Sequence, residues 1–501
     1  MVRQSDALRE SVRLFYFRAG NYNRNMSKDS LITGKILKLH GWMDGRVIGL
    51  AKDAGNQLLA QGADRETALS TLEAVRRKPG SFLADPLLAD LARECIRIAP
   101  PADKIPDDLR DQPLQYPIWG RENIDDGSLA QMDNAMRLPV SVAGALMPDA
   151  HVGYGLPIGG VLATDNAVIP YAVGVDIACR MRLSIYEVSP HLMGQKKALF
   201  ENALWEQTAF GMGAEWMGNK RAEHAVLDDP AWDATRLLQN LKDNAARQLG
   251  TSGTGNHFVE WGLFRLHESL RGLQPGEYLA LLSHSGSRSV GFKIADRYSK
   301  LAMEKHPNLE KSVRHLAWLS LQSEEGQEYW LSMELAGRFA SANHSVIHKR
   351  VAAAAGLKEA AVVENHHNFA WKESLPDGRE VIVHRKGATP AGGGVLGVIP
   401  GSMGDAGYVV RGRGVSESLE SASHGAGRLM SRKMALNSIS KWDRDDYLKE
   451  RGVTLLGGGM DESPQAYKPI DSVIAAQHDL VEVIGKFTPK IVRMADEAGE
   501  F

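Results

Sequence analysis

Beyond residue 110, glycine-rich turns alternate with short runs of β-branched residues, and this alternation constrains the fold more than any other feature of the chain. Three segments carry it: YGLPIGGVLATDNAVIP (154–170), LGTSGTGNHFVEWG (249–262) and EVIVHRKGATPAGGGVLGVIPGSMG (380–404). Glycine tolerates positive φ and close approach of another backbone, whereas β-branched residues favour strands. The pattern therefore predicts short strands joined by tight turns.

Stretches with helical periodicity separate these strand segments. Apolar residues recur at helical spacing through residues 309–356, where we expect helix with a loop break inside it, and again through 465–486. Short strands interleaved with helices predict a large α+β domain of layered β-sheets with flanking helices over residues 111–501.

Residues 1–110 differ from the rest in charge and pattern. They carry 18 basic and 14 acidic side chains, a charge of +4, whereas the remaining residues sum to −6. Helical spacing between Leu58 and Val75, with Asp64 as an N-cap and a stop at Lys78-Pro79-Gly80, predicts helices. The segment APPADKIPDD (99–108) is typical of a linker. We therefore expect a small α-helical accessory domain and linker over residues 1–110.

Composition excludes several classes of protein. Two cysteines in 501 residues exclude a disulfide scaffold and fit a reducing compartment. The sequence has neither an apolar run of about 18 residues nor a clean secretory signal, which predicts a cytoplasmic protein with no membrane association. The net charge of −2 is unlike that of a nucleic-acid coat protein, although a local basic patch can bind an anion without a basic net charge.

Histidines stand in small-residue turns at four places: His257 in TGNHF, His284 in LLSHSGSR, His367 in ENHHNFA and His424 in SASHGAGR. Loops on a rigid scaffold carry binding and catalytic groups more often than helical faces do. One such histidine is most simply a surface or capping residue, but four in the same setting indicate a site. His424 is predicted to be either a metal ligand or a nucleophile, and residue chemistry alone leaves both open.

Cys179 follows Asp176 by three residues in GVDIACRM, a spacing that can direct both side chains into one pocket. Thiolate, carboxylate and imidazole ligands together suit Mn, Fe, Co or Zn and disfavour Ca or Mg. The alternative for Cys179 is a buried, inert cysteine, and Cys95 in the helix-like LARECIRI is predicted to be such a core residue.

Basic side chains beside small-residue turns add phosphate-binding capacity. They are Arg288 in HSGSRS, Arg385 and Lys386 in VHRKGA, and Arg428 in HGAGR. Together with a metal set they suggest phosphoryl or nucleotidyl transfer. Neither a Walker A pattern nor a GxGxxG turn after a strand is present, so a P-loop or Rossmann site is not supported.

With these residues in view, the chain resembles the RtcB-type RNA ligases, GTP- and manganese-dependent enzymes of tRNA splicing and RNA repair. The matching segments run in family order over about residues 135–490 and leave residues 1–110 uncovered. They are MPDAHVGYGLPIGG (147–160), GVDIAC (174–179), GTSGTGNHFVE (250–260), HSGSR (284–288), HNFA (367–370), HRKGAT (384–389), IPGSMG (399–404), HGAGRLMSR (424–432) and DESPQAYKPID (461–471).

The resemblance implies a set of site residues. Asp176, Cys179 and His257 would hold one Mn²⁺, and Cys179, His284 and His367 a second, with the thiolate bridging. His424 would be the nucleophile that takes GMP from GTP. Asp149, Arg288, Lys386 and Arg428 match positions in catalysis or RNA phosphate handling. The nucleotide site would comprise Asn256, Phe258, Glu260, His367, Asn368, Pro400, Gly401, Ser402, Met403, His424, Gly425, Ala426 and Gly427.

The implied substrates are RNA ends that carry a 2′,3′-cyclic phosphate or 3′-phosphate and RNA ends that carry a 5′-hydroxyl, and an activating partner protein is a further expectation. The chain departs from the family at Arg180, where a glycine usually follows the cysteine, and at Gly407, where a serine is common near the guanine. Ala495 stands at or near the position of a base-contacting lysine. We therefore expect intact metal and histidine chemistry with altered guanine recognition. Two alternatives are a metal-dependent RNA-end phosphodiesterase without ligation and a non-catalytic protein that binds RNA ends or the ribosome.

Overall fold

The computed structural model describes residues 31–42, 45–98 and 107–496. The chain divides into two compact units, Met1–Pro100 and Pro101–Phe501. Most of the predicted linker, residues 99–106, lies outside the described residues. Residues 107–110 already pack within the second unit, because Asp107 Oδ1 lies 2.6 Å from His306 Nδ1 and the Arg110 amide donates to the Arg137 carbonyl at 2.8 Å. The second unit thus includes residues on the N-terminal side of position 111.

The described part of the first unit contains a group of helices. Asp64 caps the third of these as predicted, accepting from the Thr67 amide at 2.7 Å, and that helix ends before Pro79. Cys95 is buried, as predicted. The elements are α2 (Gly34–Leu39), α3 (Arg46–Ala60), α4 (Arg65–Arg77), η2 (Pro79–Phe82) and α5 (Ala89–Ile98).

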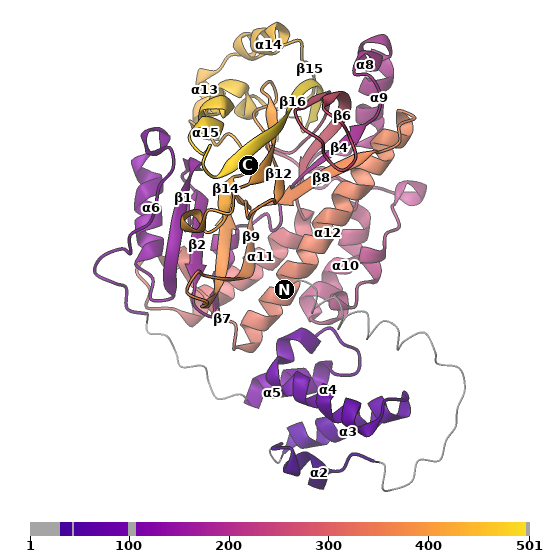
Figure 1. Ribbon diagram of the computed structural model, residues 1–501, viewed down its shortest axis with the longest axis vertical. Coiled ribbons are helices and arrows are strands. Elements are labelled where there is room, and N and C mark those ends of the chain that lie inside the picture. Colours follow the sequence, from indigo (N-terminus) through magenta and orange to yellow (C-terminus); the bar gives the residue numbers. More distant parts are fainter. Residues whose placement is uncertain (1–30, 43–44, 99–106, 497–501) are drawn as a thin grey trace. The chain divides into compact units, whose positions relative to one another are not determined.

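Two larger sheets organise the second unit (Figure 1). An 8-stranded sheet has the order β12-β13-β16-β5-β6-β4-β8, with β15 added beside β16, and a 4-stranded sheet has the order β1-β2-β10-β9. Their strands are β1 (Ser141–His151), β2 (Ile158–Thr164), β4 (Arg180–Tyr186), β5 (Phe258–Leu266), β6 (Gly276–Ser285), β8 (Ala361–His366), β9 (Phe369–Ser374), β10 (Glu380–Lys386), β12 (Leu396–Ile399), β13 (Gly407–Gly412), β15 (Thr454–Leu456) and β16 (Val481–Met494). Two short pairs complete the strands, β3 (Ala167–Val168) with β7 (Leu319–Ser320) and β11 (Ala388–Pro390) with β14 (Ser421–Ser423).

Strand alternation splits the core into layers. On β5, Val259 and Trp261 pack against helices α9 (Lys197–Gln207) and α12 (Glu324–Ala354), whereas Phe258 and Phe264 point into the opposite cluster. The larger sheet curls until its two edge strands meet, and Asn365 of β8 bonds both the amide (2.8 Å) and the carbonyl (3.3 Å) of Val398 of β12. A third cluster joins the outer side of β12 and β13 to the 4-stranded sheet.

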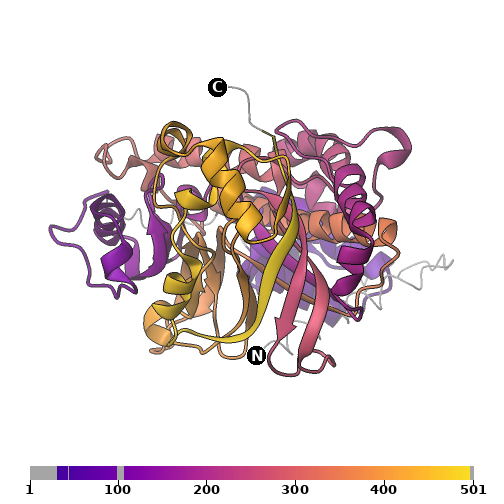
Figure 2. The same ribbon diagram turned by 90° about the horizontal axis from the view of Figure 1, so that it is seen from above.

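Helices surround these layers (Figures 1 and 2). Helix α6 packs on β1 and β2, and α11 lies between α10 and α12. The remaining helices are α6 (Asp126–Met136), α7 (Pro170–Val173), α8 (His191–Gln195), α10 (Arg236–Gln248), α11 (Arg288–Lys305), α13 (Arg432–Ser438), α14 (Lys441–Glu450) and α15 (Ile470–Ala475). None of the described helices combines the length and apolar character that a membrane span requires.

Of the two helix predictions, one is confirmed in part and one needs correction. The break expected inside 309–356 is present as a 3-10 turn, η7 (Arg314–Leu316), and β7, and the helix is continuous only from Glu324, where the Ser323 side chain caps it. Within 465–486 only α15 is an α-helix, and the chain enters β16 at Val481. Pairing with β13 on one side and β5 on the other decides this segment, because it satisfies backbone groups that a helix would satisfy locally.

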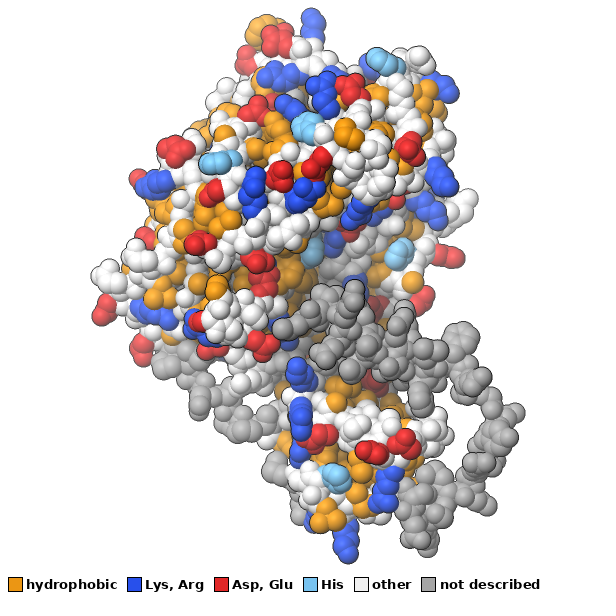
Figure 3. Space-filling view, viewed as in Figure 1, with side chains coloured by type: hydrophobic (Ala, Val, Ile, Leu, Met, Phe, Trp, Pro, Cys, Tyr) orange, Lys and Arg blue, Asp and Glu red, His pale blue; other side chains and the backbone are white. Residues whose placement is uncertain are grey.

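Charged side chains are mixed over the face of the second unit seen in Figure 3, where neither sign gathers into a patch that covers it. This distribution agrees with the net charge of −2.

Candidate active site

Four predicted ligands meet at one end of the larger sheet. Cys179 directly precedes β4, His257 precedes β5, His284 lies near the end of β6, and His367 follows β8. The antiparallel register sets this, because Phe258 pairs with His284 while Arg180 pairs with both Ser285 and His366. The register thereby brings Cys179 and His367, almost 190 positions apart in sequence, to the same end of the sheet.

The ligand atoms form a tight buried cluster. Cys179 Sγ lies 3.1 Å from His284 Nε2 and 3.4 Å from His257 Nε2. The cluster extends at both ends, since Asp176 Oδ2 lies 3.0 Å from His257 Nε2 and His367 Nε2 lies 3.3 Å from His284 Nε2. Ligand atoms about 2.0–2.3 Å from one shared metal stand roughly 3–4 Å apart, so this spacing fits a metal site.

Backbone carbonyls set the imidazole tautomers. His257 Nδ1 lies 2.9 Å from the Ser252 carbonyl, and His284 Nδ1 lies 3.1 Å from the Asn256 carbonyl. A carbonyl only accepts, so each Nδ1 carries a hydrogen. His257 Nε2 faces the Asp176 carboxylate at 3.0 Å and donates to it. His284 Nε2 keeps its lone pair toward Cys179. This is the form in which neutral histidine binds a metal.

Burial sets the protonation states. Desolvation lowers the pKa of His284 and of His367 well below the ordinary value, which keeps both rings neutral. Burial raises the pKa of Asp176, but the hydrogen bond and charge of His257 outweigh it, and the pKa falls to about 2. A charged carboxylate beside neutral imidazoles is a donor set for a transition metal.

A buried pair on α12 braces the loops that carry these ligands. Asn343 Oδ1 accepts from the amides of Gly250 (2.7 Å) and Thr251 (3.2 Å), and its Nδ2 donates to the Thr251 carbonyl at 2.9 Å. His344 Nε2 lies 3.0 Å from the carbonyl of Ser285, next to His284. One helix therefore fixes the loop before His257 and the strand end at His284.

His424 stands beside the cluster with a fixed orientation. Its Nδ1 lies 2.7 Å from Asp149 Oδ2, which also accepts from the amides of His424 (3.1 Å) and Gly425 (3.3 Å). Burial raises the pKa of Asp149, but the His424 hydrogen bond and the charge of Lys468 counter it, and that pKa stays below its ordinary value. The charged carboxylate holds the proton on Nδ1, which leaves His424 Nε2 as a free lone pair.

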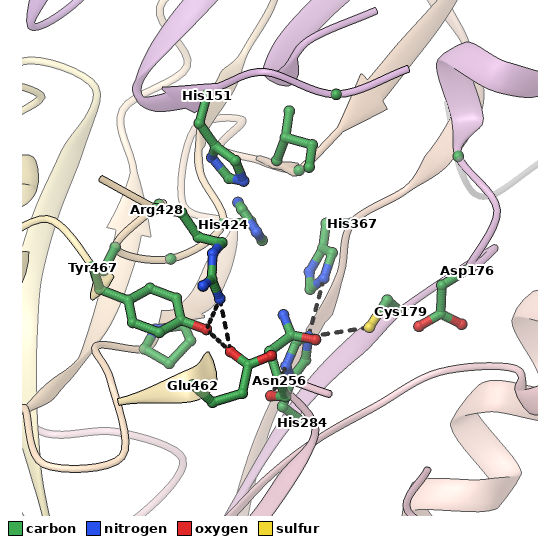
Figure 4. A pocket seen from close by; sticks show the side chains of 18 of the residues that line it. His151, Asp176, Cys179, Asn256, His284, His367, His424, Arg428, Glu462 and Tyr467 are labelled. Carbon is green, nitrogen blue, oxygen red and sulfur yellow. Dashed lines mark hydrogen bonds and ion pairs between the residues drawn. The ribbon is translucent and has the colours of Figure 1, made fainter. Parts of the chain in front are cut away.

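Cys179, His284, His367 and His424 line one cavity of about 760 Å³ (Figure 4). The predicted residues in its wall are Asp176, Cys179, Asn256, Phe258, His284, His367, Asn368, Lys386, Pro400, Gly401, Ser402, Met403, His424, Gly425, Ala426, Gly427 and Arg428. Four others stand behind the wall: Asp149, His257, Glu260 and Arg288. The sequence-predicted set therefore gathers at one site, part of it as lining and part as support.

The four predicted basic groups differ in availability. Arg385 is buried, donates to Glu373 (Nη1 to Oε1, 2.7 Å) and does not line the cavity. Lys386 Nζ donates to the Tyr154 carbonyl, and burial lowers its pKa to about 7. Arg428 is engaged by Glu462 (Nη1 to Oε2, 2.9 Å) and by the Asp461 carbonyl (2.7 Å). Arg288 lies behind the cluster, with its Nε 3.2 Å from Thr251 Oγ1.

The residues at which the chain departs from the family pattern have different surroundings in the structure. The Arg180 guanidinium bonds Glu364 and the Gly337 carbonyl (3.5 Å), and Arg180 is not among the cavity-lining residues. Met494 lines the cavity, whereas its neighbour Ala495 does not. A Cβ at Gly407 would meet its nearest neighbour at 3.5 Å, an ordinary contact, so the site has room for a small side chain there.

Two buried polar groups complete the site. Sequence reasoning assigned no role to Lys468, whose Nζ bonds the carbonyls on both sides of Asp149, Pro148 (3.1 Å) and Ala150 (2.7 Å). Its place in the segment DESPQAYKPID was the signal that could have found it. Glu260 is buried, burial raises its pKa well above the ordinary value, and its Oε2 has no hydrogen-bond partner among the described residues. A buried orphan of this kind marks the place of a missing polar partner.

Comparison with known proteins agrees with this geometry. The family model described as tRNA-splicing ligase RtcB matches residues 131–495. The chain is 34% identical to the RNA-splicing ligase RtcB of Escherichia coli K12 over 372 residues, which cover 68% of this chain and 87% of that protein. It is 31% identical to the tRNA-splicing ligase RtcB of Thermococcus kodakarensis over 439 residues, 73% of this chain and 90% of the other. It is 32% identical to the RNA-splicing ligase RtcB of Mycobacterium tuberculosis over 428 residues, 72% of this chain and 98% of the other.

Proposed function

The chain belongs to the RtcB family of RNA-splicing ligases, and from this membership we propose that it joins RNA ends through a nucleotidylated His424. The substrates are an RNA end with a 2′,3′-cyclic phosphate or 3′-phosphate and an RNA end with a 5′-hydroxyl. The cofactors are Mn²⁺ and GTP or another nucleoside triphosphate. The observation that carries the proposal is the fixed His424 ring beside the Cys179 cluster, in one cavity.

His424 performs the first step. Its Nε2 attacks the α-phosphorus of the nucleoside triphosphate, a P–N bond forms, and the P–O bond to the leaving pyrophosphate breaks. The ring gains positive charge, which Asp149 stabilises through the Nδ1 hydrogen bond of 2.7 Å. The carboxylate thus orients the nucleophile and balances the charge that it develops.

The transfer to RNA then needs two further steps. A 3′-phosphate oxygen attacks the phosphorus bound to His424, which restores the free ring and leaves the nucleotide on the RNA end. The 5′-hydroxyl of the second RNA attacks that activated phosphate, a phosphodiester forms, and the nucleoside monophosphate leaves. A 2′,3′-cyclic phosphate must first be hydrolysed to the 3′-phosphate.

The donor set would hold the metal. Asp176, Cys179 and His257 would bind one Mn²⁺, and Cys179, His284 and His367 a second, with the thiolate shared. Bound Mn²⁺ supplies positive charge that neutralises phosphate oxygens. The neutral His284 and His367 rings and the Nδ1 contacts of His257 and His284 support this assignment, because both contacts leave Nε2 of their ring facing the cluster.

Lys386 and Arg428 line the cavity and are proposed to handle RNA phosphate, whereas Arg288 acts from behind the metal ligands. Phe258, Met403 and Met494 give one part of the wall an apolar character that suits a stacked base. With Met494 in this wall, we propose that nucleotide choice is broader than in relatives with a lysine there.

The test is an adduct assay. The full chain is incubated with Mn²⁺ and each of the four α-labelled nucleoside triphosphates, and acid-labile label on the protein is measured. We expect label in the wild type and none in His424→Ala. A metal-loaded wild type that takes label from none of the four nucleotides would overturn the mechanism.

The apolar part of the cavity wall, formed by Phe258, Met403 and Met494, favours a second candidate. This candidate is an RNA-end phosphodiesterase that opens cyclic phosphates without joining RNA ends. Product analysis on a broken stem-loop RNA separates the two, because joined RNA excludes pure hydrolysis. The third candidate is a non-catalytic protein that binds RNA ends. The complete set of metal-ligand side chains disfavours it, and it predicts that the Cys179→Ala protein keeps full function.

A further inference from the structure

The turn between β1 and β2, residues 152–157, presents an aromatic ring at the cavity. Tyr154 lines the cavity wall and yet is 72% exposed, and its neighbour Val152 is also exposed. The Tyr154 ring is therefore largely open to solvent at the cavity wall. The turn therefore displays Tyr154 to whatever enters the cavity.

The backbone beneath this ring is held from three sides. The Gln131 side chain donates to the Gly153 carbonyl at 2.5 Å and accepts from the Gly153 amide at 3.0 Å. Lys386 Nζ donates to the Tyr154 carbonyl. Gly155 adopts φ +72°, and a Cβ there would lie 3.3 Å from the His315 carbonyl, so the turn sits directly on residue 315. A fixed backbone under an exposed ring is the arrangement of a preorganised binding surface.

Two more rings stand beside Tyr154. Its ring centroid lies 6.2 Å from that of His315 at an interplanar angle of 71°, and the Tyr171 centroid lies 4.9 Å from His315 at 73°. Tyr171 also lines the cavity. Both contacts are edge-to-face, and no other described ring is paired with Tyr154, so the protein itself offers it no parallel stacking partner.

We propose that Tyr154, with His315 and Tyr171 beside it, stacks the base of the nucleotide at the reacting 3′ end of the RNA. Single-stranded RNA is recognised largely by stacking of unpaired bases on such rings. The Lys386 ammonium, bonded to the carbonyl of Tyr154, stands where the phosphate of a stacked nucleotide meets positive charge. This inference rests on the proposed function, because it takes RNA as the substrate.

The experiment measures binding alone, with the full chain, Mn²⁺ and no nucleoside triphosphate. The probe is a short RNA 3′-phosphate whose last base is 2-aminopurine, and its fluorescence quenching on titration gives Kd. We expect Tyr154→Ala to weaken binding by about 5- to 150-fold, the range for loss of one base–aromatic stack. Tyr154→Phe keeps the ring and should stay within about twofold of the wild type.

Trp442→Ala is the matched control, since Trp442 is also 72% exposed but lies on α14 outside the cavity lining. It should leave Kd unchanged. A second RNA that lacks its last base completes a double-mutant cycle, and its affinity is measured by competition with the 2-aminopurine RNA. The wild type should bind the abasic RNA more weakly than the RNA with the base. Tyr154→Ala should bind the two RNAs with equal affinity. Equal losses on both RNAs would show that Tyr154 only shapes the turn, and no loss on either would also overturn the proposal.

Binding and adduct formation separate this inference from the function on which it rests. A protein that quenches 2-aminopurine through Tyr154 but forms no His424 adduct supports the stacking site and contradicts the ligase mechanism. The reverse result contradicts the stacking site alone. An effect of Tyr154→Ala confined to nucleoside triphosphate binding would assign the ring to the triphosphate and overturn the inference.

Discussion

Replacing Asp149 by asparagine tests how the protein prepares His424 for attack. The carboxylate is completely buried, and one oxygen accepts from His424 Nδ1 at 2.7 Å and from the amides of His424 and Gly425. Asparagine has the same shape and keeps an acceptor, but it removes the negative charge. The change therefore isolates the electrostatic part of the interaction.

The magnitude follows from that loss of charge. A hydrogen bond to a charged group contributes about 1.5–3 kcal/mol, against about 0.5–1.5 kcal/mol for a neutral one. The difference grows as the His424 ring becomes positive during attack, so we expect a loss of roughly 1.4–2.8 kcal/mol in transition-state stabilisation. This corresponds to adduct formation about 10- to 100-fold slower.

The assay is the single-turnover rate of label transfer to His424, with metal content and thermal melting measured on the same sample. Asp377→Asn, in the exposed turn after β9, is the matched control and should keep the wild-type rate. A folded, metal-loaded Asp149→Asn protein that reacts within twofold of the wild type would refute the reasoning, because His424 would then not depend on the charge.

Four further predictions address the rest of the site. Cys179→Ala removes the shared ligand and should lower bound Mn²⁺ and abolish the adduct; full metal content by elemental analysis would contradict this. Gly427→Ala places a Cβ 2.1 Å from the Asp149 carbonyl at φ +74°, so it should lower the melting temperature and the adduct rate, whereas Gly393→Ala, which has open space, should change neither. The pKa of Lys386 is lowered to about 7, so its ammonium is lost as pH rises through 7; RNA affinity should fall over that range, and Lys386→Met should flatten the profile. Met494→Lys should raise the ratio of GTP to ATP adduct, and an unchanged ratio would remove Met494 from base selection.

Local patterns predicted part of the fold well. Strand segments within 154–170, 249–262 and 380–404 are present, as is the Asp64 cap. The helix predicted over 465–486 was wrong outside Ile470–Ala475; from Val481 the chain forms β16, in which Gly485 lies under the Phe264 ring. The need for a glycine at this position arises from the packing of β16 against β5, which is more than 200 residues away in sequence.

The site shows the same division. Residue types and motifs identified Cys179, the four histidines and the basic groups, because donor chemistry belongs to the side chain itself. Support groups such as Asn343, His344 and Lys468 escaped, since a buried polar residue on a helix or in a turn resembles any other until its partners are known. Tyr154 was not predicted either, because its place at the cavity wall is known only from the fold.

The sequence by itself determined which chemistry the protein can perform: a thiolate, carboxylates and imidazoles in a family-specific order. Only the tertiary structure decided which atoms carry it out. Antiparallel register brings Cys179, His257, His284 and His367 to one end of a sheet. Carbonyl and carboxylate acceptors hold the Nδ1 hydrogens of His257, His284 and His424. The physical reason is that a side chain's identity is local, whereas its tautomer, charge and neighbours depend on hydrogen bonds and burial supplied by residues far away in the chain.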